Sequence, residues 1–173
     1  MDKIKNKLSQ EKIVFLQNLE MYLDTKLYFY GSIYRIDYID GVSDIDVGIF
    51  TNNMERTLLH LQQFLVIDKK EIKKFYLKTR NNKIMDGYKI MFKNKIIKLE
   101  ISIYDEQYKN IVLNDFFMVI YIPQIYSYIL IFLKFLRLFI PYPYNKIKRS
   151  IINSYKGEPD TYFFITLKGD TKK

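Results

Sequence analysis

Two aspartates in an alternating segment are the first residues of this 173-residue chain that could do chemistry. Asp44 and Asp46 open the segment DIDVGIF, residues 44–50, whose alternation of polar and apolar residues is typical of a β-strand. Residues two apart in a strand project to the same face, so both carboxylates would point into one space. Because such carboxylates repel each other unless a cation lies between them, the pattern predicts a site for a hard divalent metal ion.

Two further features surround this segment in a definite order. Gly31 and Ser32 follow a short apolar run and are separated from Asp44 by an eleven-residue loop. Glu100 comes later, as the one acid in the apolar segment IIKLEISIY, residues 96–104. This arrangement resembles the nucleotidyltransferase superfamily, the fold group of DNA polymerase β. The family has a third acid on a later strand, usually Asp, although some antibiotic-modifying relatives have Glu there.

The resemblance implies a reaction and a set of cofactors. A hydroxyl would attack the α-phosphorus of a nucleoside triphosphate, with AMP from ATP as the expected transfer, and pyrophosphate would leave. Asp44, Asp46 and Glu100 would be the catalytic and metal-binding residues, and would hold Mg²⁺ or Mn²⁺. Glu100 could hold the ion at the acceptor hydroxyl, or could take the proton of that hydroxyl directly.

The resemblance also implies a phosphate-binding role for the residues before the loop. Gly31 lets the backbone approach a triphosphate closely, and the hydroxyl of Ser32 can donate to phosphate oxygens. Arg35 lies close enough in sequence to reach the triphosphate, and Lys134 and Arg137 are alternatives if their helix packs beside the site. Each of these three cations is more often an ordinary surface residue.

Simpler interpretations exist for each acid of the motif. Asp44 and Asp46 could lie on a strand edge exposed to water, and Glu100 could pair with Lys98 or Lys89. Any one of these interpretations would prevail if the motif had a single feature. The joint order of the features favours the nucleotidyltransferase interpretation.

Three other residues that could carry chemistry are expected to have structural roles. Asp37 and Asp40 lie in the loop and are more often turn formers than ligands. His60 is the single histidine and lies in a predicted helix, where a surface or helix-packing role is the more common one.

The composition limits the setting of the chain. There are 28 Lys and Arg against 19 Asp and Glu, a net charge of +9, which suggests a polyanionic partner such as RNA. The chain has no Ala and is rich in Lys, Asn, Ile and Tyr, so part of this charge could reflect an AT-rich coding sequence. The absence of Cys excludes disulfides and thiolate sites, and residues 1–7 carry no secretory signal, so a cytoplasmic location is expected.

Alternation and capping patterns predict a mixed sheet. Helices are predicted over Ser9–Asp24 and from Met54 to about Leu65. Strands are predicted over Leu27–Tyr30, 44–50, Tyr88–Phe92 and 96–104, with the last two joined as a hairpin by Lys93–Lys95. Residues 68–78 suit either a helical turn or a strand, 81–83 suit a turn, and 162–167 are a possible last strand.

The predicted fold class is α/β (α+β), with a mixed four- to five-stranded sheet, helices mainly on one face and a C-terminal apolar helix. A single nucleotidyltransferase-like domain over residues 1–173 is expected. Its core would cover about residues 9–122, and the C-terminal helix and tail residues 123–173.

The apolar region 111–140 raises the question of a membrane span. A span needs about 20 uninterrupted apolar residues, whereas Asp115 and Pro123 interrupt this region. We therefore expect a buried helix from Pro123 or Gln124 to Phe139, ended by the following Pro-Tyr-Pro-Tyr run. An integral membrane protein is not expected.

Several functions remain open at this level. The leading one is a minimal nucleotidyltransferase, for which an RNA 3′ end is slightly favoured as acceptor over a small molecule or a protein hydroxyl. Because the chain is short, a protein partner could provide the additional surface that binds the acceptor. The alternatives are an inactive nucleotidyltransferase-like subunit that binds nucleic acid or protein, and a peripheral membrane protein anchored by Ile125–Phe139.

Overall fold

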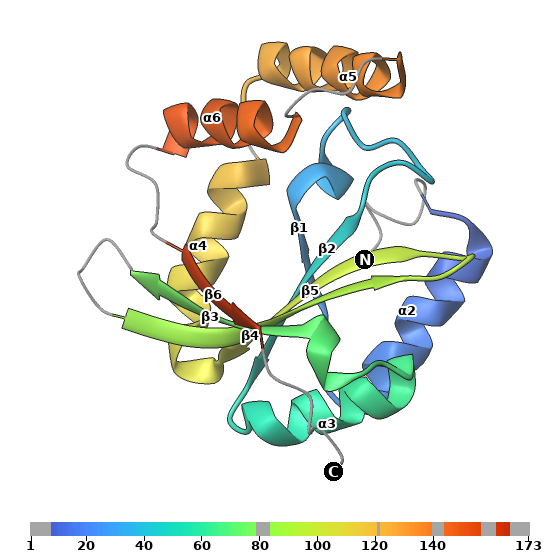
Figure 1. Cartoon of the computed structure of the whole chain (residues 1–173), viewed down its shortest axis with the longest axis vertical. Helices are drawn as coiled ribbons and strands as arrows, with labels where there is room; N and C mark the ends of the chain where they lie inside the picture. The colour runs from blue at the N-terminus through green and yellow to red at the C-terminus, as the bar shows by residue number, and fades with distance from the viewer. Residues whose placement is uncertain (1–7, 79–83, 121, 140–143, 157–161, 167–173) are drawn as a thin grey trace.

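The computed structural model describes residues 8–78, 84–120, 122–139, 144–156 and 162–166. Its strands form one sheet in the order β1-β2-β5-β4-β3-β6 (Figure 1). The strands are β1 Tyr28–Tyr30, β2 Ile45–Thr51, β3 Ile72–Lys78, β4 Ile84–Lys93, β5 Lys98–Asp105 and β6 Tyr162–Thr166. The α-helices are α2 Gln10–Leu23, α3 Met54–Leu65, α4 Lys109–Ile120, α5 Gln124–Phe139 and α6 Tyr144–Lys156. Short 3-10 turns are η1 Gly31–Tyr34, η2 Lys69–Glu71 and η3 Glu106–Tyr108.

The sheet is mixed, as predicted. Among the described strands, β2 and β5 form the one parallel pair, and all other neighbours are antiparallel. Six strands are present, because β6 adds to the edge of the sheet beside β3. The segment 68–78, which suits either structure in sequence, contains both: the turn η2 and then the strand β3.

One face of the sheet carries the larger apolar core. Alternate residues of the central strands point to this face and are buried, and α2 and α3 cover it (Figure 1). The sheet contributes Ile45, Val47, Ile49, Leu99, Ile101 and Ile103, and the helices contribute Leu16, Leu19, Leu58, Leu61 and Leu65. This core holds β2 and β5 rigidly side by side, and their opposite face carries the candidate site.

The opposite face is apolar at one end and acidic at the other. Phe50 and Tyr104 lie near the ends of β2 and β5 and pack with Val112 and Phe116 of α4. Asp46 and Glu100 point to the same face nearer the strand starts, since they lie four residues earlier. Thus α4 covers the aromatic end and leaves the acidic end for other elements.

Helix boundaries follow the capping signals closely. α3 has the predicted bounds, and the Asn53 side chain accepts a hydrogen bond of 3.0 Å from the backbone N–H of Arg56. α2 begins directly after Ser9 and ends at Leu23, and α5 begins after Pro123. The predicted turn at 81–83 lies outside the described residues.

The predicted β4–β5 hairpin is confirmed. Its connection is closed by Asn94, whose side-chain oxygen accepts hydrogen bonds from the backbone of Ile96 and Ile97 at 2.9 and 2.8 Å. Two helices, α4 and α6, lie outside the sequence-based predictions. The α4 segment is apolar at most positions, so its sequence shows no clear helical periodicity. The α6 segment directly follows a proline-rich run, so its start could not be recognised in the sequence.

Close packing across β3, β4 and β5 generates a testable prediction at Gly87. A Cβ there would lie 2.3 Å from the carbonyl oxygen of Ile103 and 2.6 Å from Cζ of the buried Phe75. We expect Gly87→Ala to lower the free energy of unfolding by about 2–3 kcal/mol, because neither neighbour can move freely. Urea unfolding of the purified protein measures this change.

The matched control is Gly41→Ala, in the loop before β2. Nothing lies within 4 Å of a Cβ at Gly41, and its positive φ of 75° alone should lower the stability by about 1 kcal/mol. Equal unfolding midpoints for the wild type and Gly87→Ala would contradict the packing of these three strands.

Candidate active site

The centre of the candidate site is a pair of carboxylates on adjacent parallel strands. Asp46 of β2 lies directly opposite Glu100 of β5 in the strand register. Adjacent strands run about 4.8 Å apart, so side chains in register on one face share the same space. Both acids line a cavity of about 200 Å³ on this face of the sheet. The structure therefore brings Asp46 and Glu100 into one space, whereas the sequence pattern predicted that Asp44 and Asp46 would share it.

The cavity has a polar side and an aromatic side. Its polar lining comes from Ser32, Arg35, Asp46, Glu100, Asp115 and Lys148. Its aromatic lining includes Tyr30, Tyr104 and Phe116. Tyr30 and Phe116 stack with ring centroids 3.8 Å apart and planes inclined by 9°, which fixes this side of the cavity. A ligand here would meet a preformed wall beside a charged surface.

Gly31 lies against the Asp46 carboxylate in a conformation that requires glycine. Its φ is 75°, and a Cβ at this position would lie 2.1 Å from Oδ2 of Asp46. Gly31 follows β1 directly and starts the turn η1, whose next residue, Ser32, is also buried at the cavity. The absence of a side chain at Gly31 thus brings bare backbone and a serine hydroxyl beside the acids.

The acidic pair is short of positive charge. Burial and the charge of Glu100 raise the pKa of Asp46 to about 7, and Asp44 adds to this rise. Lys148 of α6 and Lys89 of β4 oppose it, and Lys89 forms a salt bridge with Glu100. Because the two lysines do not restore the ordinary pKa, a further cation would be stabilised between the carboxylates. The donor set of Asp46 and Glu100 therefore fits a divalent ion.

Asp44 occupies a different environment from its two companions. It lies exposed at the residue before β2, and it is not among the residues that line the cavity. Over the described ranges of the chain, no three acidic or histidine side chains form a ready-made metal cluster. Of the three predicted ligands, the structure thus brings Asp46 and Glu100 together and places Asp44 in an exposed position just before β2.

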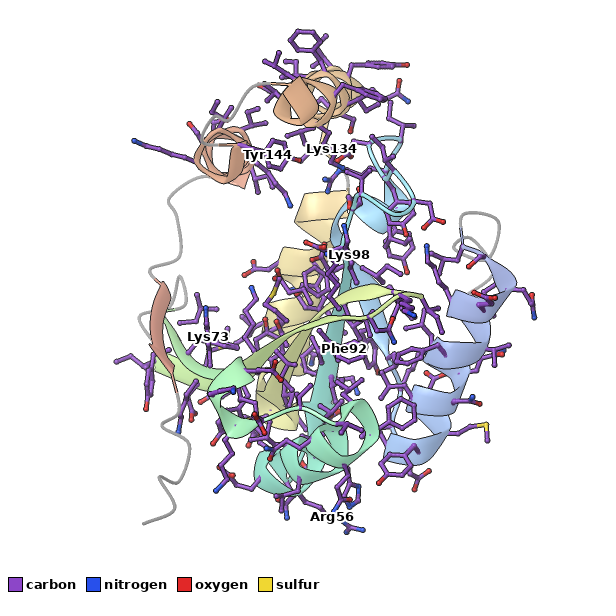
Figure 2. All side chains as sticks on the ribbon, turned by 45° about the vertical axis from the view of Figure 1, so that its right-hand side comes forward. Arg56, Lys73, Phe92, Lys98, Lys134 and Tyr144 are labelled. Atoms are coloured by element: carbon purple, nitrogen blue, oxygen red, sulfur yellow. The ribbon has the colours of Figure 1, made fainter. Side chains whose placement is uncertain are left out.

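Arg35 lines the cavity, but its guanidinium is held by Asp37. Nε of Arg35 donates to Oδ1 of Asp37 at 2.7 Å, and Nη2 donates to Oδ2 at 3.1 Å. Lys134 of α5 points toward this loop (Figure 2). Its Nζ contacts the backbone oxygen of Asp37, and lies 3.3 Å from Oδ2 of Asp37 and 3.0 Å from Oγ of Ser43. Asp37 is thus a buried ion-pair partner rather than a simple turn former.

The charge state of Asp37 follows from these contacts. Burial raises the pKa of its carboxyl, but the hydrogen bonds and charges of Arg35 and Lys134 outweigh burial and bring the pKa below its ordinary value. Asp37 is 1% exposed, so its negative charge depends on both cations. The buried network therefore ties α5 to the loop that leads into the acidic strand.

Two more lysines hold the same loop from other elements. Lys12 of α2 forms a salt bridge with Asp40, and Lys98 of β5 donates to the backbone oxygen of Gly41 at 2.9 Å. Together with Lys134, these contacts come from three separate elements of the described structure. The loop before β2 is consequently positioned by side-chain contacts and not only by its own turns.

Some site residues were not predicted from sequence, and some predicted ones lie elsewhere. Lys148 and Asp115 line the cavity from α6 and α4, two helices that lacked a clear sequence signal. Lys134 contacts the loop instead of the cavity, and the side chain of Arg137 lies outside the described part of the chain. His60 packs edge-on against a tyrosine of α2, with ring centroids 6.0 Å apart, which agrees with a helix-packing role.

The charge of the acidic pair predicts a pH dependence of stability. The pKa of Asp46 is about 7 in the folded chain and about 4 in an unfolded one, so the folded state binds more protons between these values. In EDTA, we expect the Asp46 contribution to lower stability as pH rises from about 4 to about 7. Asp46→Asn should remove this slope and should be more stable than the wild type at pH 8 or so.

The control for this measurement is Asp24→Asn, at the exposed left-handed residue that ends α2, where Asn is also tolerated. Because this variant retains Asp46, it should keep the wild-type slope of stability over the same pH range. Parallel stability curves for wild type and Asp46→Asn would contradict a charge-deficient pair.

The buried network predicts strong coupling between Lys134 and Asp37. Lys134→Met leaves a buried carboxylate with one cation fewer, so we expect the free energy of unfolding to fall by about 3 kcal/mol. Adding Asp37→Asn should recover part of this loss, because the uncompensated charge is then removed. Urea unfolding of the single and double variants measures the coupling.

Lys98→Met serves as the control, since Lys98 binds a backbone oxygen of the same loop and neutralises no buried acid. It should lower stability by about 1 kcal/mol or less. Additive effects of the Lys134 and Asp37 changes would show that the network does not hold the loop.

One solved structure to which this chain shows some similarity is described as the structure of the GLD-2/RNP-8 complex. A chain of it is 12% identical to this protein and superposes with a TM-score of 0.44, covering 91% of this chain and 64% of that chain. This protein therefore spans less than two thirds of the length of that chain. No curated protein sequence is significantly similar to this protein.

The sequence itself matches a known family. Residues 11–112 match the family described as nucleotidyltransferase domain. The matched region is more than half of the chain and contains the glycine-serine pair, both motif aspartates and the later glutamate. The resemblance carried by these residues is thus confirmed, and the chain belongs to the nucleotidyltransferase domain family.

Proposed function

We propose that this nucleotidyltransferase moves a nucleoside monophosphate, AMP from ATP, onto a hydroxyl acceptor, and that an RNA 3′ end is the first acceptor to test. The observation that carries the proposal is the register of Asp46 and Glu100 across the parallel β2–β5 pair. Both acids face a cavity that also exposes the Gly31-Ser32 turn. Acids and phosphate-binding backbone in one cavity are what nucleotidyl transfer requires.

Asp46 and Glu100 are the proposed ligands of Mg²⁺ or Mn²⁺, and Asp44 is a further ligand at the start of the strand. A bound divalent ion would neutralise charge on the phosphates and make the acceptor hydroxyl easier to deprotonate. The raised pKa of Asp46 supports this assignment, since it reflects a deficit of positive charge between the acids. Lys89, now paired with Glu100, would have to give way to the ion.

The nucleotide phosphates have their proposed partners in the same cavity, beside the acids. Gly31 offers backbone without a side chain, and the buried hydroxyl of Ser32 can donate to a phosphate oxygen. Lys148 places a positive charge at the same cavity from α6. Arg35 lines the cavity while Asp37 holds its guanidinium, so its contribution to the triphosphate would come from a fixed position.

The proton of the acceptor hydroxyl has a proposed destination in the same cavity. The acceptor oxygen attacks the α-phosphorus, the bond from that phosphorus to the bridging oxygen of the β-phosphate breaks, and pyrophosphate leaves with the electron pair. Glu100 either takes the acceptor proton on a carboxylate oxygen or acts as a metal ligand only. Its place in register with Asp46 is compatible with both roles.

The charge distribution supports an RNA acceptor. The net charge of the chain is +9, and α6 presents the exposed Lys146 close in sequence to the cavity lysine Lys148. Tyr30 at the cavity is stacked on Phe116 and so adds no separate support for base stacking. A small molecule or a protein hydroxyl is the competing acceptor.

A second candidate function has its own observation. Glu100 is already neutralised by Lys89, and the described residues contain no complete three-acid cluster. A catalytically inactive nucleotidyltransferase-like subunit that binds nucleic acid or a protein would have these two features. Metal-dependent nucleotide transfer separates the two functions.

The test uses ATP radiolabelled at the α-phosphate, with Mg²⁺ or Mn²⁺, and total RNA, a cell lysate or a small-molecule extract as acceptor. We expect label on RNA, and no transfer by Asp46→Asn or by the double variant Asp44→Asn/Asp46→Asn. Glu100→Gln should reduce the rate by about 10²–10⁴-fold, the usual contribution of general base catalysis.

Asp24→Asn is the control, since it removes one carboxylate at an exposed position far from β2 in sequence and should keep full activity. Label on a protein or a small molecule would support the transfer reaction but would show that RNA is not the acceptor. Failure of the wild type to bind ATP with either metal would overturn the catalytic proposal and favour the binding subunit.

A further inference from the structure

The outer face of α5 is a row of large apolar side chains without a partner in the described structure. Ile125, Tyr128, Ile129, Phe132 and Phe135 are each between 40% and 65% exposed. α5 lies at the edge of the molecule, with α6 and the loop before β2 on its inner side (Figures 1 and 2). We call these five residues the α5 stripe, and they account for nearly all the exposed side chains described on this helix.

The inner face of the same helix is firmly attached to the domain. Ser127, Leu130 and Lys134 are buried, and Lys134 bonds to Asp37 and Ser43 of the loop. These contacts fix the rotation of α5 about its own axis. The α5 stripe is therefore held outward by the structure and cannot turn inward without breaking the buried network.

The spacing within the α5 stripe indicates a helical partner. Ile125, Tyr128, Phe132 and Phe135 are separated by three, four and three residues, the pattern of the seam along which two helices pack. Helices that lie on a lipid surface have lysines or arginines beside their apolar face. Among the α5 side chains that the structure describes, the only charged one is Lys134, which points inward. These features favour a protein helix over a membrane.

We propose that the α5 stripe is a dimer interface, in which α5 packs against α5 of a second copy about a two-fold axis. At the exposed fractions above, the stripe presents about 500 Å² of apolar surface on each copy. Two such stripes in contact would bury about 1,000 Å², which reaches the lower limit of specific protein interfaces. A two-fold contact covers both stripes at once, because the same patch serves each copy. The proposal concerns assembly and is independent of the proposed function.

The charge of the chain adds a distinctive consequence. Two copies each carry +9, so their mutual repulsion opposes association while the uncharged stripe drives it. Salt shortens the range of the repulsion and slightly strengthens apolar burial. The dimer should therefore become tighter as salt increases, whereas a complex with an anionic partner would become weaker.

Sedimentation velocity of the full chain from about 1 to about 100 μM tests the proposal. We expect a concentration-dependent dimer whose dissociation constant falls between about 0.1 M and about 1 M salt. Phe132→Glu should raise that constant at least about 30-fold, as for the loss of an interface hot spot. Tyr128→Lys is a second variant of the same stripe with the opposite charge, and circular dichroism confirms that both variants fold.

The matched control is Leu59→Glu, which places the same charge at a 56% exposed apolar position on α3. It should leave the dissociation constant unchanged. A monomer at every concentration and salt, or equal weakening by Leu59→Glu and Phe132→Glu, would overturn the proposal. Monomeric protein that floats with phosphatidylcholine vesicles, and no longer does so as Phe132→Glu, would overturn it in favour of a lipid surface.

Discussion

The repulsion between Asp46 and Glu100 is the constraint on which the rest of the site depends. The register of the parallel β2–β5 pair leaves no freedom to separate the two acids, because the apolar residues on the other face fix both strands in the core. The neighbours respond to this constraint. Gly31 has no side chain at the point where the Asp46 carboxylate lies. Lys89 pairs with Glu100, and Lys148 adds a positive charge from α6. Replacing one of these two acids by a neutral residue would remove the repulsion and make the fold more stable. The presence of both acids therefore indicates a functional role.

The central part of this arrangement could be predicted from sequence. Strict alternation in 44–50 and 96–104 assigns the acids and the apolar residues to opposite faces of their strands, and the structure agrees. Capping residues such as Asn53 also set helix bounds correctly. None of the described helices has both the length and the hydropathy to cross a membrane.

The remaining parts depend on long-range contacts that no local pattern encodes. Asp37 was expected to form a turn, but its burial as an ion-pair partner depends on Lys134 of α5, which lies far away in the sequence. Lys148 reaches the cavity only because α6 folds back beside α4 after the proline-rich run. A last strand near residues 162–167 was expected, but the strand order and the position of β6 at the sheet edge are set by tertiary packing, which gives no periodic signal in the sequence.

The measurement that tests the central claim most directly is a crystal structure with Mn²⁺ and a non-hydrolysable ATP analogue, using anomalous scattering to locate the metal. Our account predicts an Mn²⁺ ion bound by both Asp46 and Glu100, with Lys89 turned away from Glu100 and the phosphates beside Gly31 and Ser32. A structure with the nucleotide elsewhere, no anomalous peak between the two acids and the Lys89–Glu100 salt bridge intact would contradict it.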